Sequence, residues 1–351
     1  PGALAGHRAR QACAQGHWAH RAQAQRKAVR ICLRQLITRA RRELAVMESL
    51  DSGKPILDCE TIDIPETIET LKWHAELIDK IYDQMAPAQE DAIAVILREP
   101  IGVVAAILPW NFPLLMMAWK IGPALAAGNS VIVKPAEQTS LTALRLAELA
   151  AEAGLPRGVL QVLPGDGPTV GAPLGLHMDV DMVSITGSTE TGRHFLRYAA
   201  DSNLKKVVLE CGGKNPCVVF DDAENLDAVA SHVVNAAFWN MGENCSAASR
   251  LIVHHAVKEP LLERILARLR DWKTGDPLNP AHHLGALIDA EHCAKVASYL
   301  TGTALAGGTA EGPQVQHNVE ATRPTEAHHV RELVGPNWRG ATVARHDRTI
   351  G

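Results

Sequence analysis

A cysteine in a small polar loop is the strongest candidate for chemistry in this sequence. Cys245 lies in the stretch GENCS at residues 242–246, between a predicted helix and an apolar strand at residues 251–253. A thiol in such a loop can be exposed, and a nearby helix N-terminus favours the nucleophilic thiolate. The alternative is a structural cysteine, since a free cysteine usually behaves as a small hydrophobe. We expect that role for the six cysteines without a comparable loop: Cys13, Cys32, Cys59, Cys211, Cys217 and Cys293.

Two other polar side chains follow predicted strands. Glu210 ends the strand at residues 206–209 and precedes two glycines, which is where a general base could lie. A solvated charge at a strand end is the alternative. Asn111 lies in the stretch PWNFP at residues 109–113, where its amide could stabilise an oxyanion among apolar neighbours. A turn asparagine that bonds its own backbone is equally compatible with this position.

Two segments could bind a nucleotide. The stretch TGSTETG at residues 186–192 runs from a strand into a helix, whose N-terminus can bind a phosphate, although such a start is more often only a cap. Lys134 and Glu137 are three residues apart and could bracket the hydroxyls of a ribose, or form a simple surface pair. A carboxylate there would repel a 2′-phosphate and so favour NAD over NADP.

Short apolar strands that alternate with helices must position these side chains. We predict strands at residues 103–108, 130–133, 160–163, 182–186 and 206–209, and helices at residues 114–127, 139–153, 169–175 and 189–200. This alternation is typical of an α/β domain with a parallel sheet, in which ligands bind beyond the carboxyl ends of the strands. The candidate residues follow those ends.

The remaining segments differ in character. Residues 3–50 and 66–82 are predicted to be helical. A second α/β stretch at residues 215–312 has strands at 216–220 and 250–254 and helices at 226–238, 258–272 and 290–300. Residues 313–351 lose the apolar periodicity. We interpret them as a poorly ordered tail, and we suppose a frame-shifted or misjoined end.

Composition excludes several classes of function. The 351 residues carry a net charge of −4, which argues against a nucleic-acid partner. The apolar runs are too short for a membrane span. The irregular cysteines form no disulfide framework and indicate a cytoplasmic setting. The histidine pairs are adjacent and no Cys-x-x-Cys occurs, so we expect no metal.

Five motifs in this order resemble the aldehyde dehydrogenase superfamily over residues 12–312. They are PWNFP at 109–113, VKPAE at 133–137, GSTETG at 187–192, LECGGKNP at 209–216 and GENCS at 242–246. The sequence is most similar to bacterial dehydrogenases of the γ-glutamyl-γ-aminobutyraldehyde type. The resemblance implies a Rossmann-like NAD-binding domain at residues 1–211, an oligomerisation hairpin near residues 82–100, and an incomplete α/β catalytic domain at residues 212–312.

The resemblance also implies a role for each matching residue. Cys245 would be the nucleophile that attacks an aldehyde, and Glu210 the base that activates water for the second step. Asn111 would stabilise the oxyanion, and Lys120 would act in a proton relay. The residues that would contact the cofactor are Ile107, Leu108, Pro109, Trp110, Lys134, Glu137, Gly167, Gly171, Gly187, Ser188 and Gly212.

Family members continue well beyond the matched region, with a Glu-x-Phe-Gly-Pro motif that is absent here. We therefore keep two alternatives to an active NAD-dependent dehydrogenase. One is a catalytically silent truncated chain that still binds a nucleotide or associates with subunits. The other is a thiol-dependent esterase. Homo-oligomers are implied by the family, and the missing half argues against them for this chain.

Overall fold

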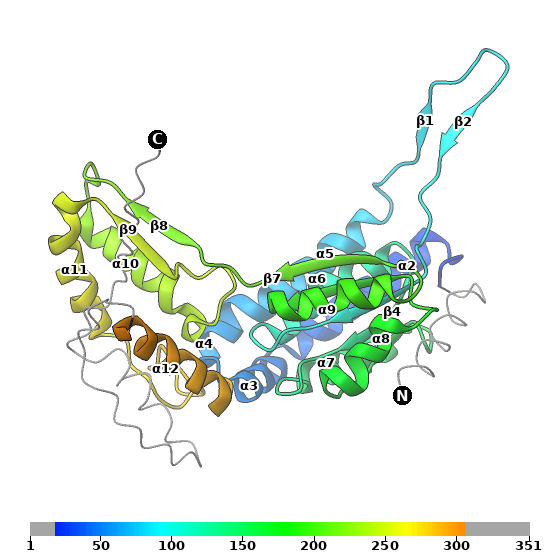
Figure 1. Ribbon diagram of the computed structural model, residues 1–351. Helices are drawn as coiled ribbons and strands as arrows, with labels where there is room; N and C mark the ends of the chain where they lie inside the picture. The colour runs from blue at the N-terminus through cyan, green and yellow to red at the C-terminus, as the bar shows by residue number, and fades with distance from the viewer. Residues whose placement is uncertain (1–17, 306–351) are drawn as a thin grey trace. The chain divides into compact units, whose positions relative to one another are not determined.

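The computed structural model describes residues 18–305, which fall into two compact units (Figure 1). Unit 1 comprises the chain up to Asp51 and Cys59–Cys211. Unit 2 comprises Ser52–Asp58 and the chain from Gly212. Cys13 and the predicted tail at residues 313–351 lie outside the described residues.

Unit 1 is built on a five-stranded parallel sheet with the order β5-β4-β3-β6-β7. Its strands are β3 (Val103–Ile107), β4 (Ser130–Lys134), β5 (Leu160–Val162), β6 (Met182–Gly187) and β7 (Lys206–Cys211). β3 and β4 are buried along their whole length, as is typical of central strands covered on both faces. The α/β class with a parallel sheet is confirmed, and the predicted strand ends are within two residues of the observed ones.

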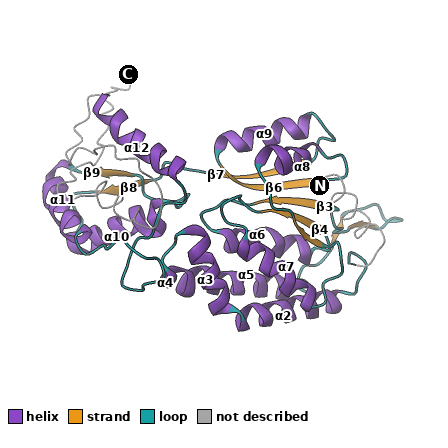
Figure 2. Ribbon diagram, turned by 90° about the horizontal axis from the view of Figure 1, so that it is seen from below, coloured by secondary structure: helices purple, strands orange, loops and turns teal. Residues whose placement is uncertain are grey.

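Helices cover both faces of this sheet (Figure 2). One face carries α6 (Pro113–Ala126) and α7 (Leu141–Glu152), and the opposite face carries α8 (Ala172–Leu176) and α9 (Thr189–Ala200). A single π-helical turn, Gly167–Gly171, leads into α8. Apolar side chains of β3 and β6 pack with Phe195 of α9 to form one core cluster.

The strand order creates a switch point between β3 and β6. From β3 the chain proceeds through α6 to β4 on one side, and from β6 it proceeds through α9 to β7 on the other. The loops that follow β3 and β6 therefore lead to opposite faces of the sheet. A crevice at the carboxyl ends of such strands is where open α/β sheets bind ligands.

The N-terminal part of unit 1 is helical. Its elements are α2 (Gln23–Arg39), α3 (Arg41–Ser52), a π-helical segment (Cys59–Asp63) and α5 (Ile64–Leu77). The prediction of a helix to residue 82 is wrong, because α5 ends at Leu77. Ile81 and Tyr82 continue its apolar spacing, but both are exposed and lead instead into a hairpin. Spacing alone does not show whether an apolar side chain has anything to pack against.

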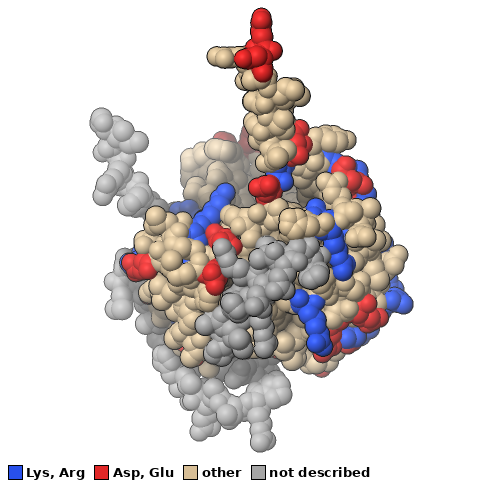
Figure 3. Space-filling model, turned by 90° about the vertical axis from the view of Figure 1, so that its right-hand side faces the viewer, with Lys and Arg blue, Asp and Glu red and all other residues tan. Residues whose placement is uncertain are grey.

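The hairpin pairs β1 (Gln84–Ala86) with the antiparallel β2 (Ala94–Ile96). It projects from the helices of unit 1, with acidic residues at its tip (Figure 3). Its apolar side chains are exposed, since Met85 is 75% and Ile93 80% accessible. A two-stranded hairpin of this kind is marginally stable without something to cover it.

A buried carboxylate joins three helices below the sheet. Glu48 of α3 is fully buried; its Oε1 accepts the Leu114 N–H at 3.1 Å and its Oε2 accepts the Thr142 hydroxyl at 2.9 Å. The first bond caps the N-terminus of α6, which begins two residues after Asn111.

Glu48→Ala is therefore expected to lower the free energy of unfolding by about 2–4 kcal/mol. The substitution leaves the buried Leu114 N–H and Thr142 hydroxyl without their hydrogen-bond acceptor. Urea denaturation measures this change. Glu43→Ala is the matched control, since Glu43 pairs with Arg145 at the surface and should matter by less than about 1 kcal/mol. Equal effects of the two substitutions would contradict the argument.

Unit 2 contains a smaller parallel pair, β8 (Pro216–Val219) and β9 (Arg250–Val253). The other elements of unit 2 are α4 (Ile56–Asp58), α10 (Leu226–Phe238), a 3-10 turn (Trp239–Gly242), α11 (His255–Leu269) and α12 (Ala290–Leu305). The predicted helix 258–272 is shifted, since α11 begins at His255 and ends at Leu269; the His254 ring accepts the Ala256 N–H at its start. Within residues 18–305, no helix is both long and apolar enough to span a membrane.

Candidate active site

The loop after β3 carries the predicted oxyanion donor. The Leu108 N–H donates to the Lys134 carbonyl at 2.9 Å, which extends the β3–β4 pairing by one residue. Pro109, Trp110 and Asn111 follow as half-buried residues, and α6 begins two residues after Asn111. Ile107, Leu108, Pro109 and Trp110 thus lie beside the switch point, and Asn111 lies at the entrance to the helix that Glu48 caps.

Lys120 lies on α6 and is 8% exposed. Its Nζ donates to the Ser184 hydroxyl of β6 at 3.2 Å. Burial lowers the pKa of Lys120 to about 8, while the negative charge of Glu210 acts in the opposite direction. The negative charge of Glu210 therefore favours the protonated form of Lys120.

Because its pKa is lowered by burial, charged Lys120 reduces the free energy of unfolding at neutral pH. Below about pH 8 the amine is charged in both states, so folding carries the full cost of burying the charge. Between about pH 8 and 10.5 the folded amine is neutral while the unfolded amine still binds a proton, so stability rises with pH.

Lys120→Met is accordingly expected to stabilise the protein at pH 7 by about 1–3 kcal/mol, a gain that vanishes near pH 10.5. Thermal unfolding across this pH range tests it. Lys206→Met is the control, since Lys206 is exposed on β7. A gain that does not depend on pH would show that burial of the charge is not its source.

The loop after β4 holds the predicted ribose pair. Lys134 is 4% exposed, and its Nζ contacts the Glu137 carboxylate at 3.2 Å and the Pro135 carbonyl at 2.8 Å. The Glu137 side chain remains 45% accessible. Both side chains lie together, and the carboxylate keeps an accessible edge.

The loop after β6 forms the N-terminus of α9. The Ser188 Oγ accepts the Thr191 N–H at 3.1 Å, so the hydroxyl does cap the helix, as the alternative expectation held. The N–H groups of Thr189 and Glu190 precede the capped one in the same first turn. Such backbone donors at a helix N-terminus favour an anion.

Three of the predicted cofactor glycines have open space where a side chain would be. A Cβ on Gly167, Gly187 or Gly212 would meet no atom within 4 Å, and on Gly171 it would touch Lys134 at 3.8 Å. Packing within the protein therefore does not require glycine at these positions. The space is available to a ligand that approaches the backbone closely.

Glu210 lies near the carboxyl end of β7, in register with Thr186 of β6. Its side chain is exposed. Unit 1 thus brings the residues after β3, β4 and β6 and the carboxylate of β7 to one edge of the sheet. Gly212 and Cys245 belong to unit 2.

Cys245 is exposed in a loop of unit 2, residues 240–247, which we call the cysteine loop. Its Sγ lies 3.7 Å from the Asn244 Oδ1, which also accepts the Ser246 N–H at 3.1 Å. The Asn215 side chain donates to the Cys245 carbonyl at 2.9 Å and to the Ala247 carbonyl at 3.3 Å. The thiol therefore projects from a loop whose backbone is held at the cysteine itself and two residues after it.

The backbone that enters this loop is strained. Asn240 and Met241 have φ values of 53° and 56°, and Gly242 continues with 73°. Left-handed conformations at residues with a side chain cost about 1–2 kcal/mol each. Such a run persists only where surrounding contacts hold it, and it lies directly before the candidate nucleophile.

Sequence reasoning missed three contributors to this arrangement. Asn215 was noted only as part of a motif. Its side chain reaches the cysteine loop because Asn215 directly precedes β8, which pairs with β9 just after that loop. Ser184, the partner of Lys120, is an ordinary strand residue by sequence. Glu243 was noted only as a neighbour of Cys245, although it is buried and accepts the Ile288 N–H at 3.2 Å.

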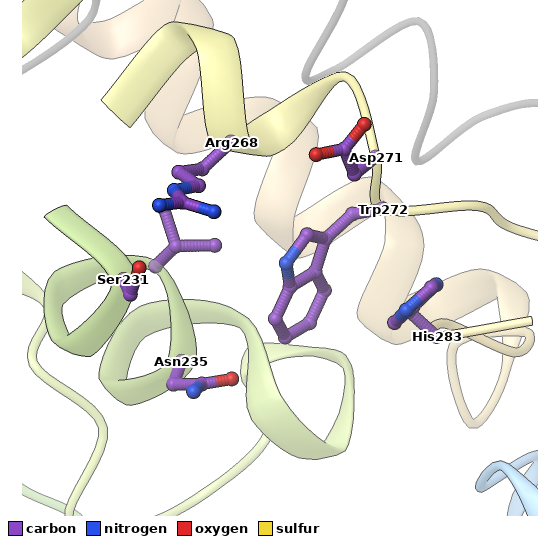
Figure 4. A pocket seen from close by; sticks show the side chains of 7 residues that line it. Ser231, Asn235, Arg268, Asp271, Trp272 and His283 are labelled. Carbon is purple, nitrogen blue, oxygen red and sulfur yellow. The ribbon is translucent and has the colours of Figure 1, made fainter. Parts of the chain in front are cut away.

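A shallow cavity of about 190 Å³ lies elsewhere in unit 2, between α10 and the end of α11 (Figure 4). Its lining is Ser231, Val234, Asn235, Arg268, Asp271, Trp272 and His283, none of which is a predicted site residue. In the described part of the chain, no three His, Cys, Asp or Glu side chains are grouped to hold a metal ion.

Comparison with known proteins identifies the family of this chain. The sequence model of the aldehyde dehydrogenase family matches residues 4–325. An aminoacetaldehyde dehydrogenase of Pseudomonas aeruginosa is 66% identical over 292 residues, which are 83% of this chain and 59% of that protein. The chain belongs to the aldehyde dehydrogenase family.

Solved structures of the family agree with this assignment. An indole-3-acetaldehyde dehydrogenase in complex with NAD+ matches with a TM-score of 0.84 and 48% identity, over 86% of this chain and 61% of that one. A γ-glutamyl-γ-aminobutyraldehyde dehydrogenase from Burkholderia cenocepacia J2315 matches with a TM-score of 0.84 and 45% identity, over 89% and 62%. The present chain spans about three-fifths of the length of these three relatives.

Proposed function

We propose that this chain acts as an NAD-dependent aldehyde dehydrogenase on aldehydes that carry an amino group. The observation that carries the proposal is the 66% identity over 292 residues to an aminoacetaldehyde dehydrogenase. The family match at residues 4–325 includes all five motifs on which the site rests. In this reading unit 1 is the NAD-binding domain and unit 2 supplies the catalytic thiol.

The residues of unit 1 fit a dinucleotide. Ile107 to Trp110 would line its site beside the switch point, and the first turn of α9, with Gly187 and Ser188, would meet the pyrophosphate. Lys134 and the accessible Glu137 would hold the adenosine ribose, where the carboxylate disfavours the 2′-phosphate of NADP. Gly167, Gly171 and Gly212 would allow close approach of the ligand to the backbone. Bound NAD would accept the hydride that leaves the substrate carbon.

The thiolate of Cys245 would form a C–S bond to the aldehyde carbon, and the electron pair of the carbonyl π bond would move to the oxygen, which becomes an oxyanion. Asn111 and the Cys245 N–H would donate to it, and such donors are each worth on the order of 3 kcal/mol. A thioester on Cys245 remains after the hydride has left. The bonds from Asn215 to the Cys245 and Ala247 carbonyls hold the backbone at the thiol.

Hydrolysis of the thioester would use the residues of β7 and α6. Glu210 would take a proton from water, which then attacks the thioester carbon and releases the carboxylate and the thiol. Lys120 has a pKa of about 8 and can therefore accept and release protons near neutrality. Its electrostatic coupling to Glu210 supports a shared role in proton transfer.

NADH formation with paired aldehydes tests the proposal. Aminoacetaldehyde against acetaldehyde isolates the amino group, for which we expect a preference in kcat/KM of at least about ten-fold. Equal values would reject aminoaldehydes as the substrate class. Absence of NADH with every aldehyde would reject the activity and favour a silent chain or, if a nitrophenyl ester is still cleaved, an esterase.

The exposed hairpin suggests how copies of the chain associate. Its apolar side chains, such as Met85 and Ile93, would be covered in a homo-oligomer. Sedimentation of wild type and Ile93→Glu would test this assembly. We assign the protein to the cytoplasm, where the free thiol of Cys245 stays reduced.

A further inference from the structure

A buried carboxylate within the cysteine loop takes no part in the bond-forming and proton-transfer steps proposed above. Glu243 lies two residues before Cys245, and its side chain is only 2% exposed. Its Oε1 accepts the Ile288 N–H at 3.2 Å and lies 3.6 Å from the His292 Nε2. Burial of a carboxyl group is unfavourable unless it is paired or hydrogen-bonded, so its position calls for a function.

Charged groups from two other segments face this carboxyl. Lys54 is fully buried and acts to lower the pKa of Glu243, whereas Asp289 acts to raise it. Burial has the largest effect and raises the pKa to about 8. Glu243 is therefore largely protonated at neutral pH, and glutamine is a close imitation of that form.

Two segments near Glu243 pack closely against each other, and together we call them the platform. The lysine turn, residues 53–55, packs backbone to backbone against residues 284–288. Gly53 has a φ of 75° and its Cβ position is filled by the Ala286 carbonyl; a Cβ on Gly285 would collide with the Gly53 carbonyl. The Ile56 N–H also donates to the Pro277 carbonyl at 2.8 Å. Nothing larger than glycine fits where the two backbones meet.

The cysteine loop needs such an anchor. It begins with the left-handed residues Asn240, Met241 and Gly242, and Glu243 is the first residue after them. The Glu243 N–H donates back to the Asn240 carbonyl at 2.9 Å, which closes this turn. The side chain of Glu243 therefore connects the strained turn to the platform through its hydrogen bond with the Ile288 N–H.

We propose that Glu243 is a positioning residue that ties the cysteine loop to the Ile288 backbone, and thereby holds the thiol of Cys245 in its reactive position. The role rests on the proposed function of Cys245. Removal of the side chain should release the left-handed turn while unit 2 stays folded.

Hydrogen exchange of the full chain tests the anchor without any need for turnover. In Glu243→Leu we expect peptides that cover residues 240–248 and 286–290 to exchange at least ten-fold faster than in wild type. Glu243→Gln should restore slow exchange, because its amide oxygen still accepts the Ile288 N–H. Ile265→Ala is the control, since it removes a core side chain of α11 and should not act selectively on the loop.

Kinetics separates positioning from simple stabilisation. For oxidation of aminoacetaldehyde, Glu243→Leu should lower kcat at least ten-fold with KM within two-fold, and Glu243→Gln should recover most of kcat. Unchanged exchange in Glu243→Leu, or failure of glutamine to restore it, overturns the proposal. A Cys245→Ala protein that still forms NADH would instead overturn the proposed function and leave the exchange result standing.

Discussion

Cys245→Ala is expected to lower the rate of NADH formation from an aldehyde by at least about 10³-fold. In the proposed mechanism the Sγ of Cys245 forms the covalent bond to the substrate, and the substitution leaves no thiol in the cysteine loop. Cleavage of a nitrophenyl ester should be lost as well. Binding of NAD, measured by calorimetry, should be unchanged, because all but one of the proposed cofactor residues belong to unit 1 and Cys245 belongs to unit 2.

Cys217→Ala is the matched control for this experiment. Cys217 is a half-buried cysteine of β8 that packs against the core of unit 2, so its loss should affect stability rather than turnover. If Cys245→Ala also loses NAD binding, Cys245 has a structural role instead. Retention of oxidation in the variant would remove the basis of the proposed mechanism.

Glu210→Gln should separate the two halves of the reaction. Steady-state turnover is expected to fall by about 10²–10⁴-fold, the usual contribution of a positioned general base. A rapid burst of about one NADH per protein chain should remain, because in the proposed mechanism hydride transfer precedes the step that needs a base. Stopped-flow absorbance measures both phases in one experiment.

Glu152→Gln serves as the comparison, since Glu152 is an exposed carboxylate at the end of α7, away from the carboxyl edge of the sheet. It should change neither phase. Absence of the burst in Glu210→Gln would show that this carboxylate acts before or during hydride transfer. An unaffected steady state would mean that another group activates the water.

Much of unit 1 was predictable because its signals are local. A continuous apolar run such as β3 or β4 predicts a buried strand without knowledge of its partners. The order of strands and helices then predicts a parallel sheet, and parallel strands bring their carboxyl ends to the same edge. For this reason the residues after β3, β4 and β6 could be expected beside one another.

The errors have a common origin. Ile81 and Tyr82 fit the period of α5, and Trp272 fits that of α11, yet both helices end earlier. A period reports which side chains share a face, and it does not report where the helix ends. Ile81 and Tyr82 are exposed beyond α5, whereas Trp272 packs against the core of unit 2 from beyond the end of α11. In the hairpin, the same apolar residue types are exposed rather than buried.

By itself the sequence determined the α/β class, the strands, and the family, because these depend on local runs and on motifs in a fixed order. Only the tertiary structure decided which distant groups support them. It places Glu48 at the N-terminus of α6, Ser184 beside Lys120, and Lys54 near Glu243. Each of these pairs joins segments that are far apart in the chain. The physical reason is that burial and partnership of a polar group arise from packing between elements, and no local pattern of residues encodes them.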